Sequence, residues 1–232
     1  MFHIIANWKA NLDRTQALNW LVEFKKSKPD LGQTRIGIAP SFTETSLIGE
    51  FLNNWNLCDQ IDLTAQNVSR FDMGAYTGEI TARHLHQLGV KLAIVGHSER
   101  RTNFHETDTD IAAKLKLLHQ YQIRPIVAVS EIAQVEFLAQ EKVIGDQTIF
   151  AYEPVESIGT GNPADPDQVR DFVNRLLQIL PAHNIKILYG GSVDAQTVAP
   201  YLELEKISGF LVGGASNKAG TFLELLKAIR SG

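Results

Sequence analysis

The sequence has a single cysteine, Cys58, among 232 residues. One cysteine cannot form an internal disulfide, which excludes a disulfide framework and favours a reducing compartment. No apolar run approaches the roughly 18 residues of a membrane-spanning helix. The start, MFHIIANWKAN, has neither the basic segment nor the apolar segment of a signal peptide. We therefore expect a cytoplasmic protein that does not insert into a membrane.

The sequence also has no excess of positive charge. Lysine and arginine number 22 against 26 aspartates and glutamates, which gives a formal net charge of −4, and no lysine/arginine block is present. Such a charge balance does not favour a nucleic-acid or anionic-membrane partner. Length alone allows one large or two small domains. Because no low-complexity segment or Pro/Gly/Ser-rich linker divides the chain, we expect a single domain over residues 1–232.

What the sequence does contain is a series of short apolar runs that do not alternate with polar residues. This pattern predicts strands buried on both faces, as in a parallel sheet. The predicted strands span residues 2–7, 35–40, 61–67, 91–97, 123–129, 148–153, 185–190 and 207–214.

Amphipathic stretches separate most of these strands and predict helices. Examples are residues 14–26, 110–121, 166–180 and 218–229.

Two of these helices have start signals, an N-cap at Asp165 before Pro166 and an N-cap at Thr107. Eight βα units can close into a barrel or remain an open, doubly wound sheet. The count of eight and the lack of GxGxxG after the first strand favour a closed (β/α)8 barrel.

Polar residues follow three of the predicted strands: Asn7 and Lys9 after the first, His97 after the fourth and Glu153 after the sixth. Each alone is well explained as a surface lysine, a turn asparagine, a structural histidine or a solvated carboxylate. In a barrel, however, the carboxyl ends of all strands meet at one mouth, where active sites lie. Their joint occurrence there predicts an active site.

Glycines follow the last two strands, in Gly190-Gly191-Ser192 and in Gly213-Gly214. Glycines that lead into short helical turns expose backbone N–H groups, which bind phosphate well. These features predict phosphate-ester chemistry with Glu153 and His97 as the acid–base pair. No metal site is expected, because His84 and His86 lie two residues apart on a predicted helix and point to different faces.

Six motifs, in order along the whole chain, resemble those of the triosephosphate isomerase family. They are ANWKAN, AQNVSRFDMGAYTGEIT, AIVGHSERR, AYEPVESIGTG, YGGSV and LVGGAS. The family has a (β/α)8 barrel fold and interconverts dihydroxyacetone phosphate and D-glyceraldehyde 3-phosphate. It needs no cofactor.

The resemblance implies a role for each polar residue at the mouth. Glu153 is the base that moves a proton between two carbons of the substrate. His97 is a neutral electrophile because it adjoins the N-terminus of a short helix that begins near Ser98. Lys9 and Asn7 stabilise negative charge on the substrate oxygens, and Glu99 holds Lys9 in place.

The resemblance also implies a lid loop and a phosphate site. The backbone N–H groups of Gly159, Ser192, Gly213 and Gly214 hold the phosphate. Ile158 and Leu211 form an apolar clamp over the base, while Tyr189 and Ser192 hydrogen-bond the closed lid. The lid loop consists of Pro154, Val155, Glu156, Ser157, Ile158, Gly159, Thr160, Gly161, Asn162, Pro163 and Ala164.

By the same resemblance the protein is a homodimer, in which Thr77 at the tip of the third loop reaches the partner's site beside Asn7 and Lys9. Two other functions stay open. One is a catalytically silent relative that binds sugar phosphates or proteins, which would have little need for all four polar residues. The other is a different phosphate-handling barrel enzyme, such as a pentulose-phosphate epimerase, which should show metal-ligand histidines at strand ends.

Among the departures of the chain from the family pattern, two concern the lid and the fifth helix. Glu156 replaces the usual tryptophan at the first hinge of the lid, and we interpret it as a residue that alters lid motion and not as a second catalytic acid. Only 21 residues separate Glu131 from Glu153, fewer than is usual in the family. The fifth barrel helix is therefore expected to be short or partly missing, leaving the fifth and sixth strands less covered.

Overall fold

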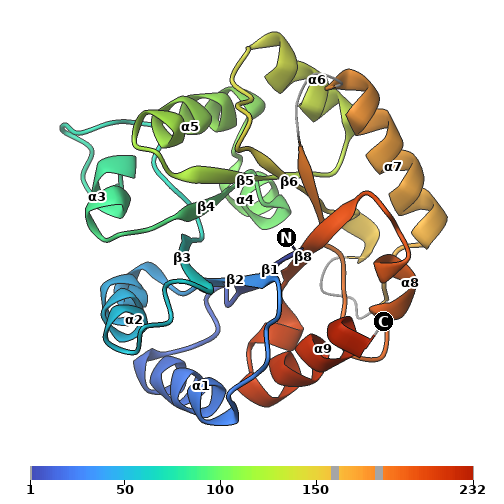
Figure 1. Cartoon of the computed structure of the whole chain (residues 1–232). Helices are drawn as coiled ribbons and strands as arrows, with labels where there is room; N and C mark the ends of the chain where they lie inside the picture. The colour runs from blue at the N-terminus through green and yellow to red at the C-terminus, as the bar shows by residue number, and fades with distance from the viewer. Residues whose placement is uncertain (1, 158–161, 181–184, 232) are drawn as a thin grey trace.

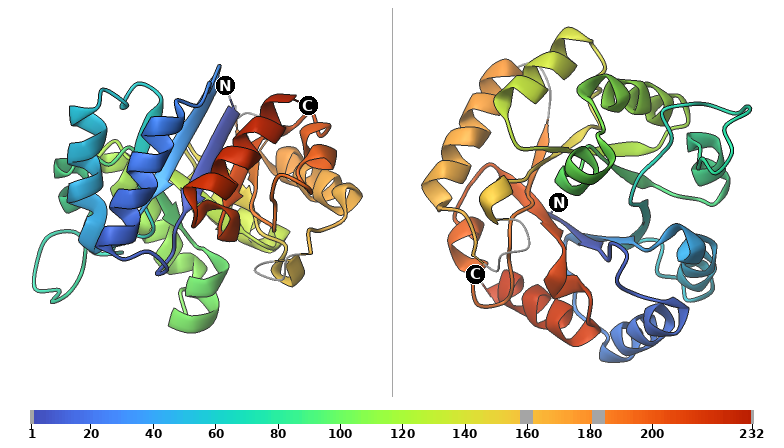
Figure 2. Two further views of the ribbon diagram at one scale, coloured as in Figure 1. Left: turned by 90° about the horizontal axis from the view of Figure 1, so that it is seen from below. Right: turned by 180° about the vertical axis from the view of Figure 1, so that it is seen from behind.

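The computed structural model describes residues 2–157, 162–180 and 185–231. In this part of the chain, eight parallel strands pair in sequence order and β8 pairs with β1, so the sheet closes on itself. Helices surround the closed sheet in the end-on views (Figures 1 and 2). The predicted single-domain (β/α)8 barrel is confirmed.

Each predicted apolar run coincides with one strand to within one or two residues at either end. The strands are β1 (Phe2–Asn7), β2 (Thr34–Ala39), β3 (Ile61–Ala65), β4 (Leu92–Val95), β5 (Arg124–Val129), β6 (Ile149–Tyr152), β7 (Lys186–Tyr189) and β8 (Ile207–Val212).

The helices follow the strands around the barrel. They are α1 (Arg14–Ser27), α2 (Phe42–Asn54), α3 (Ala82–Gln87), α4 (Ser98–Phe104), α5 (Asp108–Gln120), α6 (Ile132–Gln140), α7 (Pro166–Ile179), α8 (Ala199–Leu202) and α9 (Ala219–Ser231), with 3-10 turns η1 (Val155–Ser157) and η2 (Gly214–Ser216). None of the helices in the described residues is long and apolar enough to cross a membrane.

Both predicted helix starts are confirmed. The Asp165 side chain accepts a hydrogen bond from the N–H of Asp167 and Pro166 opens α7. Thr107 and Asp110 form a capping box, in which each side chain accepts from the other's backbone N–H, so two of the unpaired donors at the start of α5 are satisfied.

The helix after β5 is present and short. α6 has 9 residues, whereas α5 and α7 have 13 and 14. The expectation that β5 and β6 are less covered is wrong, because nearly all their residues are buried. Val135 and Leu138 of α6 are fully buried, and Tyr152 at the end of β6 stacks on Phe172 of α7 with ring centroids 3.8 Å apart.

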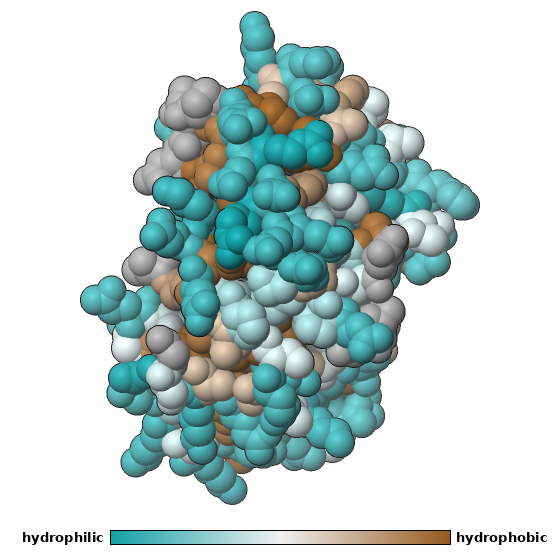
Figure 3. All heavy atoms as spheres, turned by 90° about the vertical axis from the view of Figure 1, so that its right-hand side faces the viewer, coloured by the Kyte–Doolittle hydropathy of each residue, from teal (hydrophilic) through white to brown (hydrophobic). Residues whose placement is uncertain are grey.

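Apolar side chains fill the middle of the barrel. Alternate strand residues form a separate buried cluster that includes Ile5, Leu92, Ile126 and Leu188. Successive side chains of a strand point to opposite faces, so the intervening residues pack outward against the helices. The outer surface over the α7 side is mostly hydrophilic, with apolar residues in limited patches (Figure 3).

The amino end of the barrel is closed by polar side chains from the odd-numbered strands, namely His3 of β1, Asp62 of β3, Arg124 of β5 and Lys186 of β7. Asp62 is buried and accepts hydrogen bonds from Arg124 (3.2 Å) and from both Nε and Nη2 of Arg35 on β2 (2.6 and 2.7 Å). Lys186 Nζ donates to His3 Nε2 at 2.8 Å. Because Asp62 is paired with two arginines, its buried carboxylate is not left unpaired at the end of the apolar core.

Within this layer, the environment of His3 disfavours its protonated form. Its side chain is buried and its Nδ1 atom makes no hydrogen bond within the described residues. Burial, followed by the charges of Lys186 and Arg124, lowers the pKa of His3 from 6.5 to about 4. The folded chain therefore holds His3 neutral under conditions in which the unfolded chain protonates it.

This difference makes stability fall as the pH falls from about 6.5 to about 4, because the unfolded state binds the extra proton. The loss attributable to His3 approaches about 3 kcal/mol at full titration, at about 1.4 kcal/mol per pK unit. We expect His3→Gln to show a correspondingly smaller drop in unfolding free energy between pH 7 and pH 4.5. Urea denaturation at one fixed protein concentration measures this drop, and equal drops in both proteins would contradict the assignment.

Candidate active site

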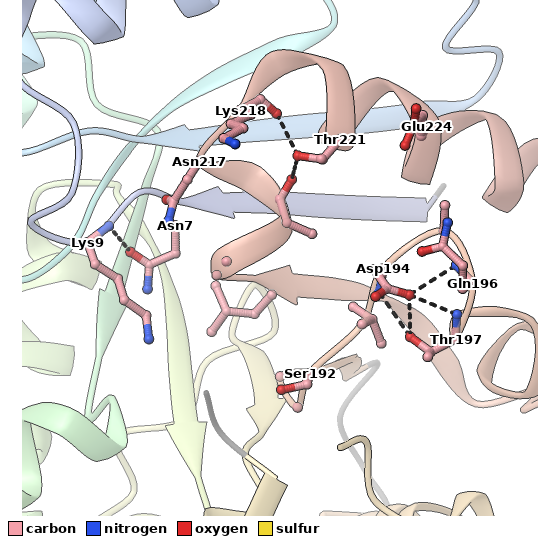
Figure 4. A pocket seen from close by; sticks show the side chains of 18 of the residues that line it. Asn7, Lys9, Ser192, Asp194, Gln196, Thr197, Asn217, Lys218, Thr221 and Glu224 are labelled. Carbon is pink, nitrogen blue, oxygen red and sulfur yellow. Dashed lines mark hydrogen bonds between the residues drawn. The ribbon is translucent and has the colours of Figure 1, made fainter. Parts of the chain in front are cut away.

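The polar residues predicted at the strand ends meet in one pocket at the carboxyl end of the barrel. The pocket has a volume of about 610 Å³, and Figure 4 shows its walls formed by the segments after β1, β7 and β8. The predicted site residues that line it are Asn7, Lys9, His97, Glu153, Ser192, Gly213 and Gly214.

Glu153 directly follows β6, and its backbone N–H donates to Val129 O of the neighbouring strand at 2.8 Å. The residue is 1% exposed. Oε1 lies 3.1 Å from His97 Nε2, and Oε2 accepts from the Ser98 N–H at 2.9 Å. Gly190 leaves room for this side chain, because a Cβ there would lie 2.9 Å from Glu153 Cγ.

His97 is the N-cap of α4, so its ring is fixed by the helix start. Nδ1 accepts a hydrogen bond from the Glu99 N–H at 3.2 Å and must therefore carry a lone pair. The ring proton then lies on Nε2, which faces Glu153. The hydrogen-bond network thus assigns the neutral tautomer that can donate from Nε2.

Lys9 has a left-handed backbone with φ +51°, which is unfavourable for a residue with a side chain. Its N–H donates to Asn7 Oδ1 at 3.1 Å and its ammonium donates to Glu99 Oε1 at 2.5 Å. Gln66 fixes the other side of this residue, since its amide donates to Lys9 O at 2.8 Å and to Ala39 O at 2.9 Å. Asn7, Glu99 and Gln66 together hold the lysine in this conformation.

Gln66 was missed in the sequence analysis, although it follows β3 at the same end of the barrel as the other polar residues. That position was the signal that could have identified it. Its contacts to β1 and β2 loops join residues far apart in the sequence, which local patterns do not reveal.

The segments after β7 and β8 form the opposite wall of the pocket. A Cβ on Gly213 would lie 3.3 Å from Lys9 Cε, so glycine brings this backbone close to the lysine. Within the described residues, the N–H groups of Ser192 and Gly214 donate to no loop or turn acceptor. Both residues line the same pocket as Lys9, so these N–H groups can donate to an anion bound there.

The two described ends of the predicted lid loop contact the β7 segment. Ser192 Oγ donates to Ser157 O at 2.7 Å, and the Ala164 N–H donates to the Tyr189 hydroxyl at 2.9 Å. Val155 to Ser157 form η1, whereas Asn162, Pro163 and Ala164 lead directly to the α7 N-cap. Ile158, Gly159, Thr160 and Gly161, as well as the side chain of Glu156, lie outside the described residues.

Three other residues considered in the sequence analysis lie away from the pocket. Thr77 is exposed on the loop between β3 and α3, which protrudes from the barrel (Figures 1 and 2). His84 Nδ1 accepts from the Thr81 N–H at the start of α3. His86 Nδ1 bonds to Tyr121 O at 2.9 Å, so both histidines have structural partners.

The Gln66 contacts generate a prediction for the isomerisation expected from the resemblance. We expect Gln66→Met, which keeps the side-chain length and removes both donors, to lower kcat/KM by about 10- to 100-fold through misplacement of Lys9. Steady-state kinetics with parallel thermal denaturation measures this effect. Wild-type kcat/KM in a folded variant would show that Gln66 does not position the lysine.

Comparison with known proteins agrees with this geometry. The family model described as triosephosphate isomerase matches residues 2–229. The chain is 38% identical to the triosephosphate isomerase of Mesomycoplasma hyorhinis, with 96% of each chain covered. It is 36% identical to that of Mycobacterium sp. (strain JLS), covering 99% of this chain and 96% of the relative. It is 35% identical to that of Thermus thermophilus, with 97% of each covered. The chain therefore belongs to the triosephosphate isomerase family.

Proposed function

We propose that this chain interconverts dihydroxyacetone phosphate and D-glyceraldehyde 3-phosphate by moving one proton between two carbons. The observation that supports this most directly is the buried pair of Glu153 and His97, 3.1 Å apart, with the Lys9 ammonium lining the same pocket. A base, a neutral hydrogen-bond donor and a cation are the three groups that formation of an enediolate requires.

Glu153 removes the proton from the carbon beside the carbonyl. The electrons of that C–H bond become a carbon–carbon double bond, and the carbonyl electrons move to the oxygen. The same carboxyl group then returns the proton to the neighbouring carbon. Oε2 already accepts a hydrogen bond from the Ser98 N–H, and Oε1 lies 3.1 Å from His97 Nε2. A carboxylate offers about four lone-pair directions, so it can still face the substrate.

Water exclusion makes this step feasible. A glutamate with the pKa of about 4.3 that it has in water is a poor base for a carbon acid. Removing water from a carboxylate strengthens it as a base. The burial of Glu153 in the pocket, which Leu211 (3% exposed) also lines, supplies part of this exclusion, and the lid loop over residues 154–164 supplies the rest.

His97 and Lys9 stabilise the charge that appears on the substrate oxygens. The Nε2–H of His97 donates to the oxygen of the breaking carbonyl and passes protons between the two enediolate oxygens. Lys9 places its ammonium beside the same oxygens with Asn7, and Glu99 orients that ammonium. The proton transfers require neither a cofactor nor a metal ion.

The phosphate is held by the backbone N–H groups of Gly159, Ser192, Gly213 and Gly214. The N–H groups of Ser192 and Gly214, which line the same pocket as the Lys9 cation, support this assignment for the described part of the site. A catalytically silent relative is disfavoured because Asn7 and Gln66 hold Lys9 in a strained conformation, which sugar-phosphate binding alone does not need.

The reaction is tested by assaying isomerisation of glyceraldehyde 3-phosphate in wild type and in Glu153→Gln, which removes the base and keeps the shape. We expect kcat to fall by about 10²- to 10⁴-fold, the usual worth of a positioned base. Glu136→Gln, the same change at an exposed position on α6, is the matched control and should retain full activity. Equal rates for wild type and Glu153→Gln would overturn the mechanism.

A homodimer formed through the loop over residues 66–80 is part of the proposal. The loop protrudes, and its Met73 and Tyr76 side chains are 50% and 43% exposed. A contact within the loop helps to fix its conformation, since Phe71 stacks on Tyr76 with ring centroids 4.2 Å apart. Exposed apolar side chains on a rigid projection favour a protein partner, and Thr77 lies at its tip beside Tyr76.

Sedimentation equilibrium at micromolar concentration should show a dimer for wild type. We expect Thr77→Glu to shift the protein toward monomer because the added charge is buried in the contact. A monomeric wild type would contradict the proposal. The single cysteine also supports a cytoplasmic location, which cell fractionation tests.

A further inference from the structure

Tyr201, on the short helix α8, lies in an unusual position for a core tyrosine. It is 2% exposed, and its ring stacks on Tyr189 with centroids 4.4 Å apart and an interplanar angle of 13°. Its hydroxyl donates to the carbonyl oxygen of Ala164, which lies 37 residues earlier in the chain. Nothing in the chemistry derived above uses this hydroxyl.

The two tyrosines together hold both polar groups of Ala164. The Ala164 N–H donates to the Tyr189 hydroxyl at 2.9 Å, and the Ala164 carbonyl accepts from the Tyr201 hydroxyl. The Tyr189 hydroxyl also interacts with that of Tyr201. Because the single proton of the Tyr201 hydroxyl is directed to Ala164 O, Tyr189 is the donor in this contact. The three bonds form a closed ring in which every hydroxyl donates once and accepts once.

This ring is rigidly mounted. Tyr189 is the last residue of β7, and Tyr201, on α8, is packed in the hydrophobic core of the barrel. Gly191 is required for the arrangement, because a Cβ there would lie 2.1 Å from the Tyr189 hydroxyl oxygen. A backbone segment that bonds to such a frame has a defined orientation, since hydrogen bonds in a connected, buried network strengthen one another.

Ala164 is also the last residue before the Asp165 N-cap of α7. It is therefore the point at which the loop over residues 154–164 joins a fixed helix. Burial is the main cause that raises the pKa of both tyrosines, so both hydroxyls remain protonated donors at neutral pH. Turning the Ala164 peptide away would leave the buried Tyr201 hydroxyl without its acceptor and the Tyr189 hydroxyl without its donor, which is costly.

We propose that Tyr201 is a positioning residue for the isomerisation, because its hydroxyl fixes the Ala164 peptide in the orientation in which the loop protects the bound enediolate from water. This inference rests on the proposed function, in which that loop acts as a lid. Tyr201 does not touch the substrate and acts through the hinge.

Tyr201→Phe removes the hydroxyl and keeps the stacked ring, so it isolates this contact. Three quantities report on it: kcat/KM for isomerisation, the dissociation constant of 2-phosphoglycolate, and the fraction of turnovers that end in phosphate loss. In that side reaction the enediolate electrons form a new carbon–carbon double bond to the terminal carbon as phosphate leaves with the electrons of its C–O bond. The resulting enol gains a proton on that carbon and loses its hydroxyl proton, which gives methylglyoxal. Water access to the enediolate increases this fraction.

We expect Tyr201→Phe to lower kcat/KM about tenfold, to weaken 2-phosphoglycolate binding by a similar factor and to raise the fraction of phosphate loss at least threefold, about the effect of losing one buried hydrogen bond. Tyr189→Phe should act in the same direction. The double variant should lose less than the product of the two single effects, because either change opens the same ring.

Leu21→Ala, a change on the buried face of α1, controls for lost stability. It should lower the melting temperature and leave the fraction of phosphate loss unchanged. A Tyr201→Phe protein that resembles this control, or that binds 2-phosphoglycolate as tightly as wild type, would overturn the proposal.

The experiment separates this proposal from the proposed function. If Glu153→Gln is inactive and wild type loses little phosphate, while Tyr201→Phe behaves as wild type, only the role of Tyr201 fails. If wild type itself loses phosphate at the rate of the free enediolate, the lid function fails and the role of Tyr201 fails with it.

Discussion

Pairing of β8 with β1 is the constraint from which the site follows. It joins the first and last strands of the chain and brings Gly213 so near the Lys9 side chain that a Cβ on this glycine would lie 3.3 Å from Lys9 Cε. Since all eight strands are parallel, closure also directs the residues after β4 and β6 into the same mouth. The contact between Glu153 and His97, 3.1 Å apart in space and 56 positions apart in sequence, exists only because the intervening strand pairs are complete.

Polar groups occupy both ends of the barrel interior, but they have different roles at the two ends. At the amino end, Asp62 is satisfied by two arginines and His3 is held neutral, so the layer is a static closure. At the carboxyl end, a lysine is held in a left-handed backbone conformation and free N–H groups face the pocket. The apolar residues between the two layers separate the part of the barrel that supports stability from the part that supports chemistry.

The strands and the polar residues at their ends could be predicted because each corresponds to a short, contiguous pattern of residues in the sequence. Buried parallel strands appear as unbroken apolar runs, and Glu153 or His97 directly follows such a run. Gln66 and Tyr201 could not be assigned in this way, because their roles depend on contacts to Lys9 and Ala164 that only the closed barrel creates. The coverage of β5 and β6 was misjudged for the same reason, since a stacked pair from β6 and α7 compensates for a short α6.

The backbone of Lys9 has a consequence for how this protein can be engineered. A left-handed residue with a side chain costs about 1 kcal/mol or more relative to glycine, so glycine at position 9 would relax the fold locally. The same replacement would remove the lysine whose ammonium pairs with Glu99, one of two lysines that line the pocket in the described residues. Stability and activity therefore make opposite demands on this one residue, and a library sorted for heat resistance alone would be drawn toward inactive variants.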